Sequence, residues 1–244
     1  MKLSKSHPRY ESLRIRELIE LGVKNGITSS AGLIAHGRGE AFDYLLGEKT
    51  HGFAKEAVVA AAKLLLIAKH PVISVNGNAA ALVAKELIAL AAMLHCPLEV
   101  NIFHESKERE KKIKNWLIKN GANQVVSPEK KFTIKHIASN RKYVNGDGIY
   151  KADVVFVPLE DGDRAEALVK NGKKVITIDL NPLSRTAKIA TITIVDNITR
   201  GLPLLLSHLK SHKLRKQLKG HKNYDNHVIL QKAELALRHV PSRI

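Results

Sequence analysis

The chain opens with two helical hydrophobic patterns and then changes to short apolar runs. Over Tyr10–Asn25, apolar residues recur at helical spacing, and Gly26 follows where a C-terminal cap belongs. A second helix is predicted over Phe53–His70, because Pro71 disfavours helical backbone in the residue before it. Between these helices lies a stretch, Thr28–Glu48, that has no repeating apolar pattern.

From residue 72 onward, short β-branched runs alternate with helical patterns. The predicted strands are Val72–Val75, Leu98–Phe103, Val125–Val126, Val154–Val157, Val175–Ile178 and Ile192–Val195. The predicted helices between and after them are Ala79–His95, Ser106–Asn120, Arg164–Asn171 and Ile198–Leu209. Strands separated by helices form right-handed βαβ units. Nearly continuous apolar strands are typical of a sheet whose two faces are both covered by helices. The pattern predicts an α/β, Rossmann-like fold: a mostly parallel sheet with helices on both faces, N-terminal helices and a C-terminal helical arm.

The chain is predicted to consist of a main domain and a tail. Its 244 residues, 44% of them hydrophobic, are enough for one large domain or one domain with an appendage. We expect residues 1–209 to form the Rossmann-like domain with its N-terminal helical segment. Residues 210–244 are predicted to be a basic extension with one more helix, Val228–Arg238. The basic, poorly patterned segment Ser127–Tyr150 is interpreted as an exposed insertion.

Polar residues directly follow three of the predicted strands. The clusters are Asn76-Gly77-Asn78, Glu160-Asp161-Gly162-Asp163 and Asp179-Leu180-Asn181. Because ligands of open parallel sheets bind beyond the carboxyl ends of the strands, these clusters predict a binding site on one rim. The asparagines either hold an anion at the start of a helix or cap that helix. The acidic cluster either binds Mg²⁺ beside phosphates or forms a turn.

The stretch Thr28–Glu48 combines glycine with charged side chains. Its glycines are Gly32, Gly37 and Gly39, which permit close approach of the backbone to a ligand. With His36, Arg38 and Glu40 among them, we expect a tight bend that binds a phosphorylated or carboxylated small molecule; the alternative is a glycine-rich turn with a solvated charge pair. The third glycine of a dinucleotide fingerprint is missing and no Walker-type phosphate loop is present, which disfavours hydride transfer and a Walker ATPase.

The net charge of +17 favours polyanionic partners, of which nucleic acid is the usual one. The charge is nevertheless widely spread, with dense segments at residues 107–119, 130–142 and 210–222. An aromatic content of 5% supplies few platforms for stacking bases. We interpret most of the lysine as solvated surface and keep nucleic-acid binding as an alternative function.

The single cysteine, Cys96, excludes an intramolecular disulfide and a cysteine-based zinc site. Residues 1–16 are polar and basic, without the apolar core of a secretory signal. The longest apolar runs are well under the ~20 residues of a membrane span. These features predict a cytoplasmic protein that does not bind membranes.

Four segments together resemble one known family. They are TSSAGLIAHGRGEAFDYLLGE (Thr28–Glu48), VISVNGN (Val72–Asn78), VPLEDGDR (Val157–Arg164) and DLNPLSRTA (Asp179–Ala187). They resemble the archaeal phosphopantothenate synthetases, also called 4-phosphopantoate–β-alanine ligases, over about Pro8–Leu209. The resemblance implies an enzyme of coenzyme A biosynthesis that joins 4-phosphopantoate to β-alanine with ATP and Mg²⁺, and releases AMP and pyrophosphate through an acyl-adenylate. It also implies a homodimer, whose interface the first two helices could supply.

The resemblance assigns residues to this reaction as well. The nucleotide site is expected at Arg16, Arg38, Asp179, Leu180, Asn181, Arg185, Thr186, Asn197 and Ile198. The 4-phosphopantoate site is expected at Ser29, His36, Asn76, Asn78 and Asp161. We expect His36, Arg38 and Asp161 to take part in catalysis, and the metal ligands and the β-alanine pocket are left open. A nucleic-acid-binding protein and another nucleotide-dependent transferase on a Rossmann-like fold are the alternatives.

Overall fold

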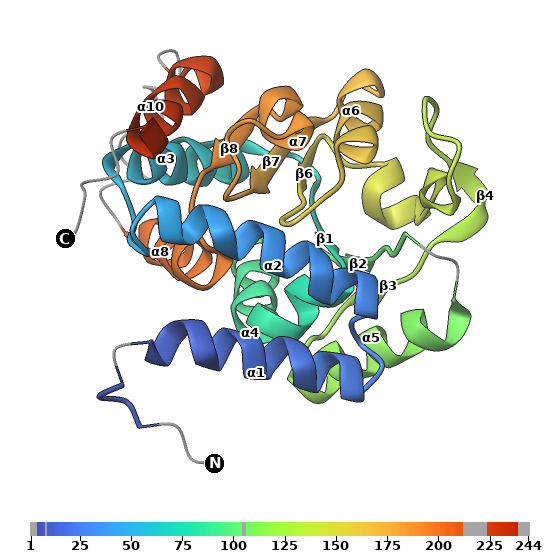
Figure 1. The fold of residues 1–244 in the computed structure, drawn as a ribbon. Helices are drawn as coiled ribbons and strands as arrows, with labels where there is room; N and C mark the ends of the chain where they lie inside the picture. Colours follow the sequence, from blue (N-terminus) through green and yellow to red (C-terminus); the bar gives the residue numbers. More distant parts are fainter. Residues whose placement is uncertain (1–3, 8, 104–105, 212–223, 239–244) are drawn as a thin grey trace.

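A computed structural model describes residues 4–7, 9–103, 106–211 and 224–238 of the chain. A six-stranded parallel sheet lies at its centre, between layers of helices (Figure 1). The strands are β1 (Pro71–Val75), β2 (Leu98–Val100), β3 (Val125–Val126), β6 (Val154–Phe156), β7 (Lys174–Ile178) and β8 (Ile192–Ile194). Their order is β3-β2-β1-β6-β7-β8, and every neighbouring pair is parallel. The prediction of a parallel Rossmann-like sheet is confirmed, although β2 is shorter than expected.

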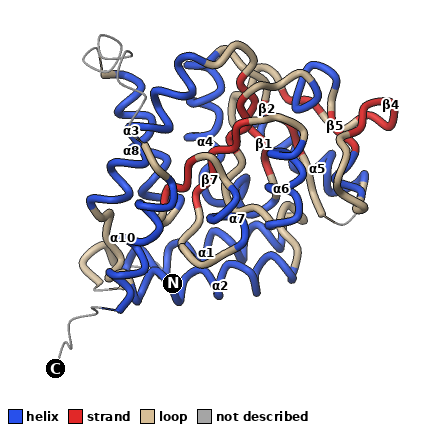
Figure 2. Tube along the Cα trace, turned by 90° about the horizontal axis from the view of Figure 1, so that it is seen from above, coloured by secondary structure: helices blue, strands red, loops and turns tan. Residues whose placement is uncertain are grey.

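Helices surround the strands of the parallel sheet when the molecule is seen from above (Figure 2). They are α1 (Tyr10–Lys24), α2 (Ser30–Leu45), α3 (Gly52–Ile67), α4 (Gly77–Leu94), α5 (Lys107–Lys119), α6 (Gly162–Lys170), α7 (Arg185–Ile189), α8 (Ile198–Lys210) and α10 (Asn226–Arg238). Gly26 follows α1 with a φ of 68°, as expected of a cap. Helix α4 is long and apolar enough to cross a membrane by length and composition alone, but it packs against α1, α5 and α8. The short helix α7 has no counterpart in the sequence prediction.

Successive residues of the strands face two separate cores, because side chains alternate across a strand. Ile73 and Phe156 belong to the larger core, which α3, α4 and α8 complete. Val72 and Val155 belong to a smaller core on the opposite face, which includes Leu168 of α6. Since both faces are covered, the strands consist of nearly continuous apolar residues.

The strand order reverses between β1 and β6. From β1 the chain continues outward through β2 and β3, whereas β6, β7 and β8 follow in the other direction. In open sheets of this kind, the ligand crevice lies beyond the carboxyl ends of the strands at the reversal. Asn76 follows β1, and Asp161 lies in the loop after β6, so the predicted polar rim is at this position.

The predicted bend at Thr28–Glu48 is wrong, because most of this stretch is helix α2. Ser29 caps the helix by accepting a hydrogen bond from the Gly32 N–H at 3.2 Å. Asn78, at the start of α4, accepts from the Thr28 hydroxyl and donates to the Gly32 carbonyl, both at 2.8 Å. Each glycine disfavours a helix by about 1 kcal/mol relative to alanine. Contacts with a distant segment therefore stabilise a helix that the local pattern does not indicate.

Residues 127–150 are only partly exposed, which corrects the expectation of an exposed insertion. They form an antiparallel hairpin, β4 (Glu129–Thr133) and β5 (Tyr143–Val144), with a 3-10 turn η1 (Asn140–Lys142) before β5 and a π-helical turn η2 (Gly146–Tyr150) after it. Glu99 of β2 accepts from the backbone N–H groups of Asn145 at 3.1 Å and Ile149 at 2.7 Å. Burial raises the pKa of Glu99 to about 7. A polar anchor of this kind leaves no hydrophobic period in the sequence.

Helix α10 packs against α3, α7 and β8 (Figure 1). Ile229, Leu230 and Ala233 are buried there. The Asn226 side chain accepts from the Thr193 N–H of β8 at 2.8 Å and donates to the Ala187 carbonyl at 2.9 Å. The predicted helix Val228–Arg238 is therefore present. The lysine-rich segment before it lies mostly outside the described residues, and a domain boundary at residue 209 stays a prediction.

Candidate active site

Two adjoining cavities open at the carboxyl edge of the sheet. Cavity A has a volume of about 350 Å³ and cavity B of about 360 Å³. The predicted site residues that line cavity A are His36, Arg38, Asn78, Asp161, Asp179, Leu180, Asn181, Asn197 and Ile198. Those that line cavity B are Ser29, Arg38, Asn76, Asn78 and Asp161. Because Arg38, Asn78 and Asp161 line both, the two cavities share a wall.

Helix α2 contributes to both cavities, and its His36 side chain has an unusual hydrogen-bonding environment. Ala35 and Arg38 line both cavities, whereas His36 lines cavity A. The His36 Nε2 atom is buried and has no hydrogen-bond partner among the described residues. Burial lowers the pKa of His36, and the opposing charge of Glu40 does not restore it. The imidazole is therefore neutral at pH 7 and can accept a hydrogen bond or a proton.

Asn76 joins the two sides of the strand reversal. Its Oδ1 atom caps α4 by accepting from the Ala79 N–H at 3.0 Å. Its Nδ2 atom donates to the Pro158 carbonyl at 3.1 Å and the Leu159 carbonyl at 2.9 Å, in the loop after β6. The helix cap, one of the two sequence interpretations, is what this side chain provides. The positive end of α4 nevertheless borders cavity B through Gly77 and Asn78.

Glu160 is buried between two arginines and does not face solvent as a turn residue would. One carboxylate oxygen accepts from Arg141, and the other accepts from Arg164 Nη1 at 2.7 Å. Arg164 is fully buried and also donates to the Ser74 hydroxyl at 3.1 Å. Burial would raise the pKa of Glu160, but the two arginine charges outweigh it and lower the pKa. Glu160 is therefore an ionised anchor for both arginines.

Asp161, the next residue, faces both cavities. It accepts from Arg141 Nη1 at 2.9 Å, and its side chain remains 57% exposed. Burial raises the pKa of Asp161, and Arg141 opposes that shift. Among the described residues, no group of three or more His, Cys, Asp or Glu side chains is placed to hold a metal ion. A metal at this edge would need ligand atoms from the substrates.

The loop after β7 is held by its own side chains. The Asp179 carboxylate accepts from the Asn181 N–H at 2.9 Å and from the Ser184 hydroxyl. Ser184 in turn caps α7 by accepting from the Ala187 N–H at 2.9 Å. Burial raises the pKa of Asp179. A carboxylate in this setting, on the wall of cavity A, can accept hydrogen bonds from the hydroxyl groups of a ribose.

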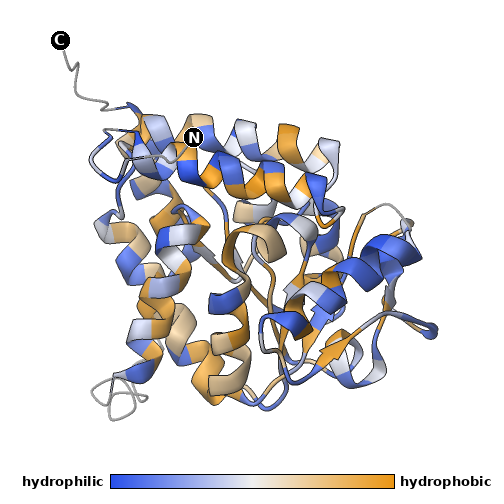
Figure 3. Ribbon diagram, turned by 90° about the horizontal axis from the view of Figure 1, so that it is seen from below, coloured by the Kyte–Doolittle hydropathy of each residue, from blue (hydrophilic) through white to orange (hydrophobic). Residues whose placement is uncertain are grey.

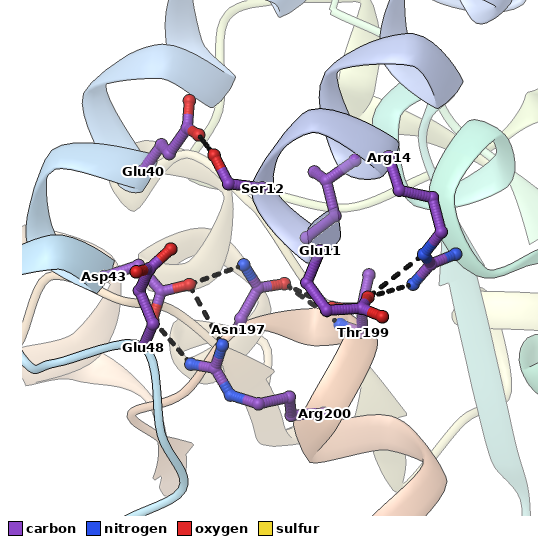
Figure 4. A pocket seen from close by; sticks show the side chains of 10 residues that line it. Glu11, Ser12, Arg14, Glu40, Asp43, Glu48, Asn197, Thr199 and Arg200 are labelled. Carbon is purple, nitrogen blue, oxygen red and sulfur yellow. Dashed lines mark hydrogen bonds and ion pairs between the residues drawn. The ribbon is translucent and has the colours of Figure 1, made fainter. Parts of the chain in front are cut away.

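Asn197 lines cavity A and connects α2 to the start of α8. Figure 4 shows it between Asp43 and Thr199, from the side of a third, neighbouring cavity. Its Oδ1 atom caps α8 through the Thr199 N–H at 3.1 Å, and its Nδ2 atom donates to Asp43 at 2.9 Å. Asp43, the buried residue of α2, also accepts from Arg200 at 2.5 and 3.1 Å. The third cavity, of about 380 Å³, lies beside this network between α1, α2 and α8. The network fixes the distance between α2 and α8 across cavity A.

Arg16, a predicted nucleotide ligand, lines neither cavity A nor cavity B. Its Nε atom donates to Glu40 at 3.0 Å, and its Nη2 atom donates to the Tyr44 hydroxyl at 2.7 Å. The side chain therefore lies between α1 and α2. Its assignment to the nucleotide stays a prediction.

Arg185 and Thr186, two further predicted nucleotide ligands, also lie outside the lining of both cavities. Arg185 forms an ion pair with Glu166 and is 60% exposed. Thr186 is buried, and its hydroxyl donates to the Glu160 carbonyl at 2.8 Å. Thr186 thus connects α7 to the loop that carries Asp161, and the nucleotide role of both residues stays a prediction.

Two arginines that the sequence analysis missed line cavity B. Arg109 comes from the first turn of α5, and Arg141 comes from η1. Only 5% of Arg141 is exposed, its Nε atom is buried without a partner among the described residues, and its guanidinium carbon lies 5.5 Å from the Phe103 ring centroid. Each is the single arginine of a lysine-rich segment. Arginine suits anion recognition better than lysine. A single arginine within a lysine-rich segment could therefore have indicated these two residues from the sequence.

The arrangement suits two anionic molecules placed side by side. Both cavities contain the Arg38 side chain, and cavity B adds Arg109 and Arg141. Cys96 lines neither cavity, and burial raises its pKa to about 12, so it is no thiolate nucleophile. The geometry therefore favours a reaction between two bound molecules through positioning and charge.

Known proteins match this chain over almost its full length. A model of the phosphopantothenate/pantothenate synthetase family matches residues 53–240. The 4-phosphopantoate–β-alanine ligase of Thermococcus kodakarensis is 50% identical over 244 residues, which cover 98% of this chain and 93% of that protein. The protein of the same name from Methanosarcina mazei is 50% identical over 232 residues, 93% of this chain and 90% of its own. The one from Methanospirillum hungatei JF-1 is 52% identical over 200 residues, 82% of each chain.

Proposed function

This chain belongs to the phosphopantothenate/pantothenate synthetase family, and we propose that it is a ligase that joins 4-phosphopantoate to β-alanine in coenzyme A biosynthesis. The observation that carries the proposal is the pair of cation-bordered cavities that share Arg38 and Asp161. Such a pair can hold two anionic substrates with their reacting groups at the shared wall. A cytoplasmic location is part of the same proposal.

We assign the nucleotide, ATP, to cavity A. Asp179 and Asn181 lie in the rigid loop after β7, where a carboxylate can bind ribose hydroxyls. Asn197 and Ile198 border the same cavity at the N-terminal end of α8, whose positive dipole end favours phosphate. Arg38 at the shared wall then lies between the nucleotide phosphates and the second substrate.

We assign 4-phosphopantoate to cavity B and propose an acyl-adenylate route. The carboxylate of 4-phosphopantoate attacks the α-phosphorus of ATP, and pyrophosphate leaves. The amine of β-alanine then attacks the acyl carbon, and AMP leaves as the amide forms. Arg38 offsets the negative charge that develops in both steps. Neutral His36, whose Nε2 has no partner in the described part of the chain, accepts the proton that the amine must lose.

Mg²⁺ fits this site through Asp161. A Mg²⁺ ion beside phosphates is usually held by one or two carboxylates together with phosphate oxygens and water. Asp161 supplies a partly exposed carboxylate at the wall that both substrates share. Bound there, the ion would neutralise phosphate charge.

The proposed enzyme is a homodimer that forms through its N-terminal helices. Helix α2 exposes Leu33, Ile34, Tyr44 and Leu45, and Ile34 is 68% exposed. Figure 3 shows hydrophobic residues along the N-terminal helices. Apolar surface gathered on one helix is characteristic of protein–protein contact. A second copy covers this surface in the proposed assembly, and light scattering of the purified chain measures its mass.

A product assay tests the proposed reaction. With 4-phosphopantoate, β-alanine and ATP-Mg²⁺, we expect 4′-phosphopantothenate, AMP and pyrophosphate in equal amounts. Omission of any one substrate should prevent amide formation. ADP and phosphate in place of AMP and pyrophosphate would refute the acyl-adenylate route, because they indicate an acyl-phosphate intermediate.

A further inference from the structure

Three arginines border cavity B. Among the described residues, its lining includes Arg38, Arg109 and Arg141 but only one carboxylate, that of Asp161. Asp161 already pairs with Arg141 at 2.9 Å. Burial lowers the pKa of Arg109 and the nearby charge of Arg141 lowers it further, whereas the charge of Glu110 opposes the shift. An anion placed between the two guanidinium groups would relieve this repulsion.

Two helix N-termini add to the positive potential of the same cavity. Ser29 and Ala31 line it from the start of α2, and Gly77 and Asn78 line it from the start of α4. The first turn of α4 lies close to the backbone that precedes α2, since a Cβ at Gly77 would lie 2.4 Å from the Ile27 carbonyl oxygen. Helices of 16 and 18 residues both direct their positive ends to this point.

Arg141 is held in position for a ligand. Glu160, which Arg164 also contacts, pairs with its Nη1 atom, and the Phe103 ring lies beside the guanidinium group. The Nε atom is buried without a partner among the described residues, so this buried side chain retains donor capacity. A preorganised guanidinium group of this kind is typical of phosphate and carboxylate recognition.

We propose that the phosphate group of 4-phosphopantoate binds in cavity B between Arg109, Arg141 and the start of α4, and that Arg109 makes the enzyme prefer phosphorylated over unphosphorylated pantoate. The inference rests on the proposed function. The carboxylate of the same molecule, at the opposite end of its carbon chain, then extends to the shared wall at Arg38. The phosphate is favoured over the β-alanine carboxylate because a dianion with three oxygens matches two guanidinium groups and two helix ends.

Arg109→Gln is the test variant, and Lys111→Gln is its matched control. Both substitutions remove one positive charge from α5, but Lys111 lines neither cavity A nor cavity B. For Arg109→Gln we expect the KM for 4-phosphopantoate to rise about 10- to 100-fold, because the variant loses one charge-assisted hydrogen bond to the phosphate. The KM values for ATP and β-alanine should stay within about twofold of the wild-type values. The kcat/KM for unphosphorylated pantoate should not change. The ratio of kcat/KM for 4-phosphopantoate to that for pantoate should therefore fall by the same factor by which the KM for 4-phosphopantoate rises.

Equal KM values for 4-phosphopantoate in the two variants would overturn the inference. A rise confined to the KM for β-alanine would also overturn it, because it would assign the arginines to that carboxylate. Titration with inorganic phosphate in a calorimeter gives a readout without turnover: wild type and Lys111→Gln should bind it more tightly than Arg109→Gln. If wild type makes no 4′-phosphopantothenate, the proposed function fails, and the phosphate titration still decides whether Arg109 forms an anion site.

Discussion

At the residue scale, most side chains around the two cavities also hold the fold together. Asn76 caps α4 and binds two carbonyl groups after β6, and Asn197 caps α8 and binds Asp43. Substitution of either residue would therefore change stability and activity together. His36 differs, because its Nε2 atom has no partner among the described residues. A change at His36 should act on the chemistry with little effect on the fold.

His36→Gln should remove a step in the pH dependence of the reaction. Burial lowers the pKa of His36 below the ordinary histidine value of 6.5, so the neutral form already dominates at pH 6.5. Wild-type kcat should fall as the pH falls through that pKa, because the imidazolium ion cannot accept a proton. In His36→Gln we expect kcat to be about 10²–10⁴ lower and this acidic limb to be absent. Steady-state rates over about pH 5 to 8 provide the measurement.

His70→Gln is the matched control, since His70 is exposed and lines neither cavity. It should keep both the rate and the acidic limb. An unchanged limb in His36→Gln would assign the titration to another group and remove His36 from the proton transfer.

At the element scale, α2 depends on its contact with α4. Its glycines are unequal: a Cβ at Gly32 would lie 2.5 Å from Asn78 Oδ1, whereas a Cβ at Gly37 would have no heavy atom within 4 Å. The first glycine permits the contact that fixes the first turn of the helix. The second has no such steric role and only weakens the helix.

Gly32→Ala and Gly37→Ala should therefore change stability in opposite directions. Gly32→Ala displaces Asn78 from Thr28 and from α2, so we expect the free energy of unfolding to fall by about 1–3 kcal/mol. Gly37→Ala should raise it by up to about 1 kcal/mol through helix propensity. Urea unfolding followed by circular dichroism measures both. Equal stabilisation by the two substitutions would show that Asn78 does not hold the start of α2.

The sequence predicted those elements whose residues form an unbroken period. The strands β1, β6, β7 and β8 are short apolar runs, and the residues that follow them, such as Asp161 and Asp179, line the cavities as expected. Helix α2 was missed because a polar clamp from α4 stabilises it. Arg109 and Arg141 were missed because lysine-rich surroundings concealed them, and because the burial of Arg141 depends on Glu160, 19 residues away. Pairings of this range leave no local pattern.

At the scale of the whole molecule, the first and the last helix of the described chain pack against different elements. Helix α1 packs against α4, and α10 packs against α3, α7 and β8. None of the α10 residues lines cavity A or cavity B. The C-terminal helix thus contributes to stability at a distance from the proposed chemistry.

Removal of residues 210–244 should lower stability and largely preserve catalysis. It exposes the surface that Ile229 and Leu230 cover and removes the Asn226 bonds to Thr193 and Ala187. We expect a lower melting temperature, and a kcat within about fivefold of wild type (about 1 kcal/mol) wherever the shortened chain is folded. Calorimetry and AMP production measure the two quantities. Asn226→Ala, the control, should lower stability by about 1–3 kcal/mol with kcat unchanged. Loss of turnover in a well-folded truncated chain would place the C-terminal residues in the active site.

The wall that cavities A and B share has a consequence for inhibition. Because Arg38, Asn78 and Asp161 line both cavities, shared side chains lie between the proposed nucleotide site and the proposed 4-phosphopantoate site. A single molecule with an adenosine group at one end and a phosphorylated pantoyl group at the other can therefore occupy both volumes. Joining the two groups by a non-hydrolysable link avoids the entropy loss of a second association. Such a compound should bind much more tightly than either half alone, with the linker length set by the thickness of the wall at Arg38.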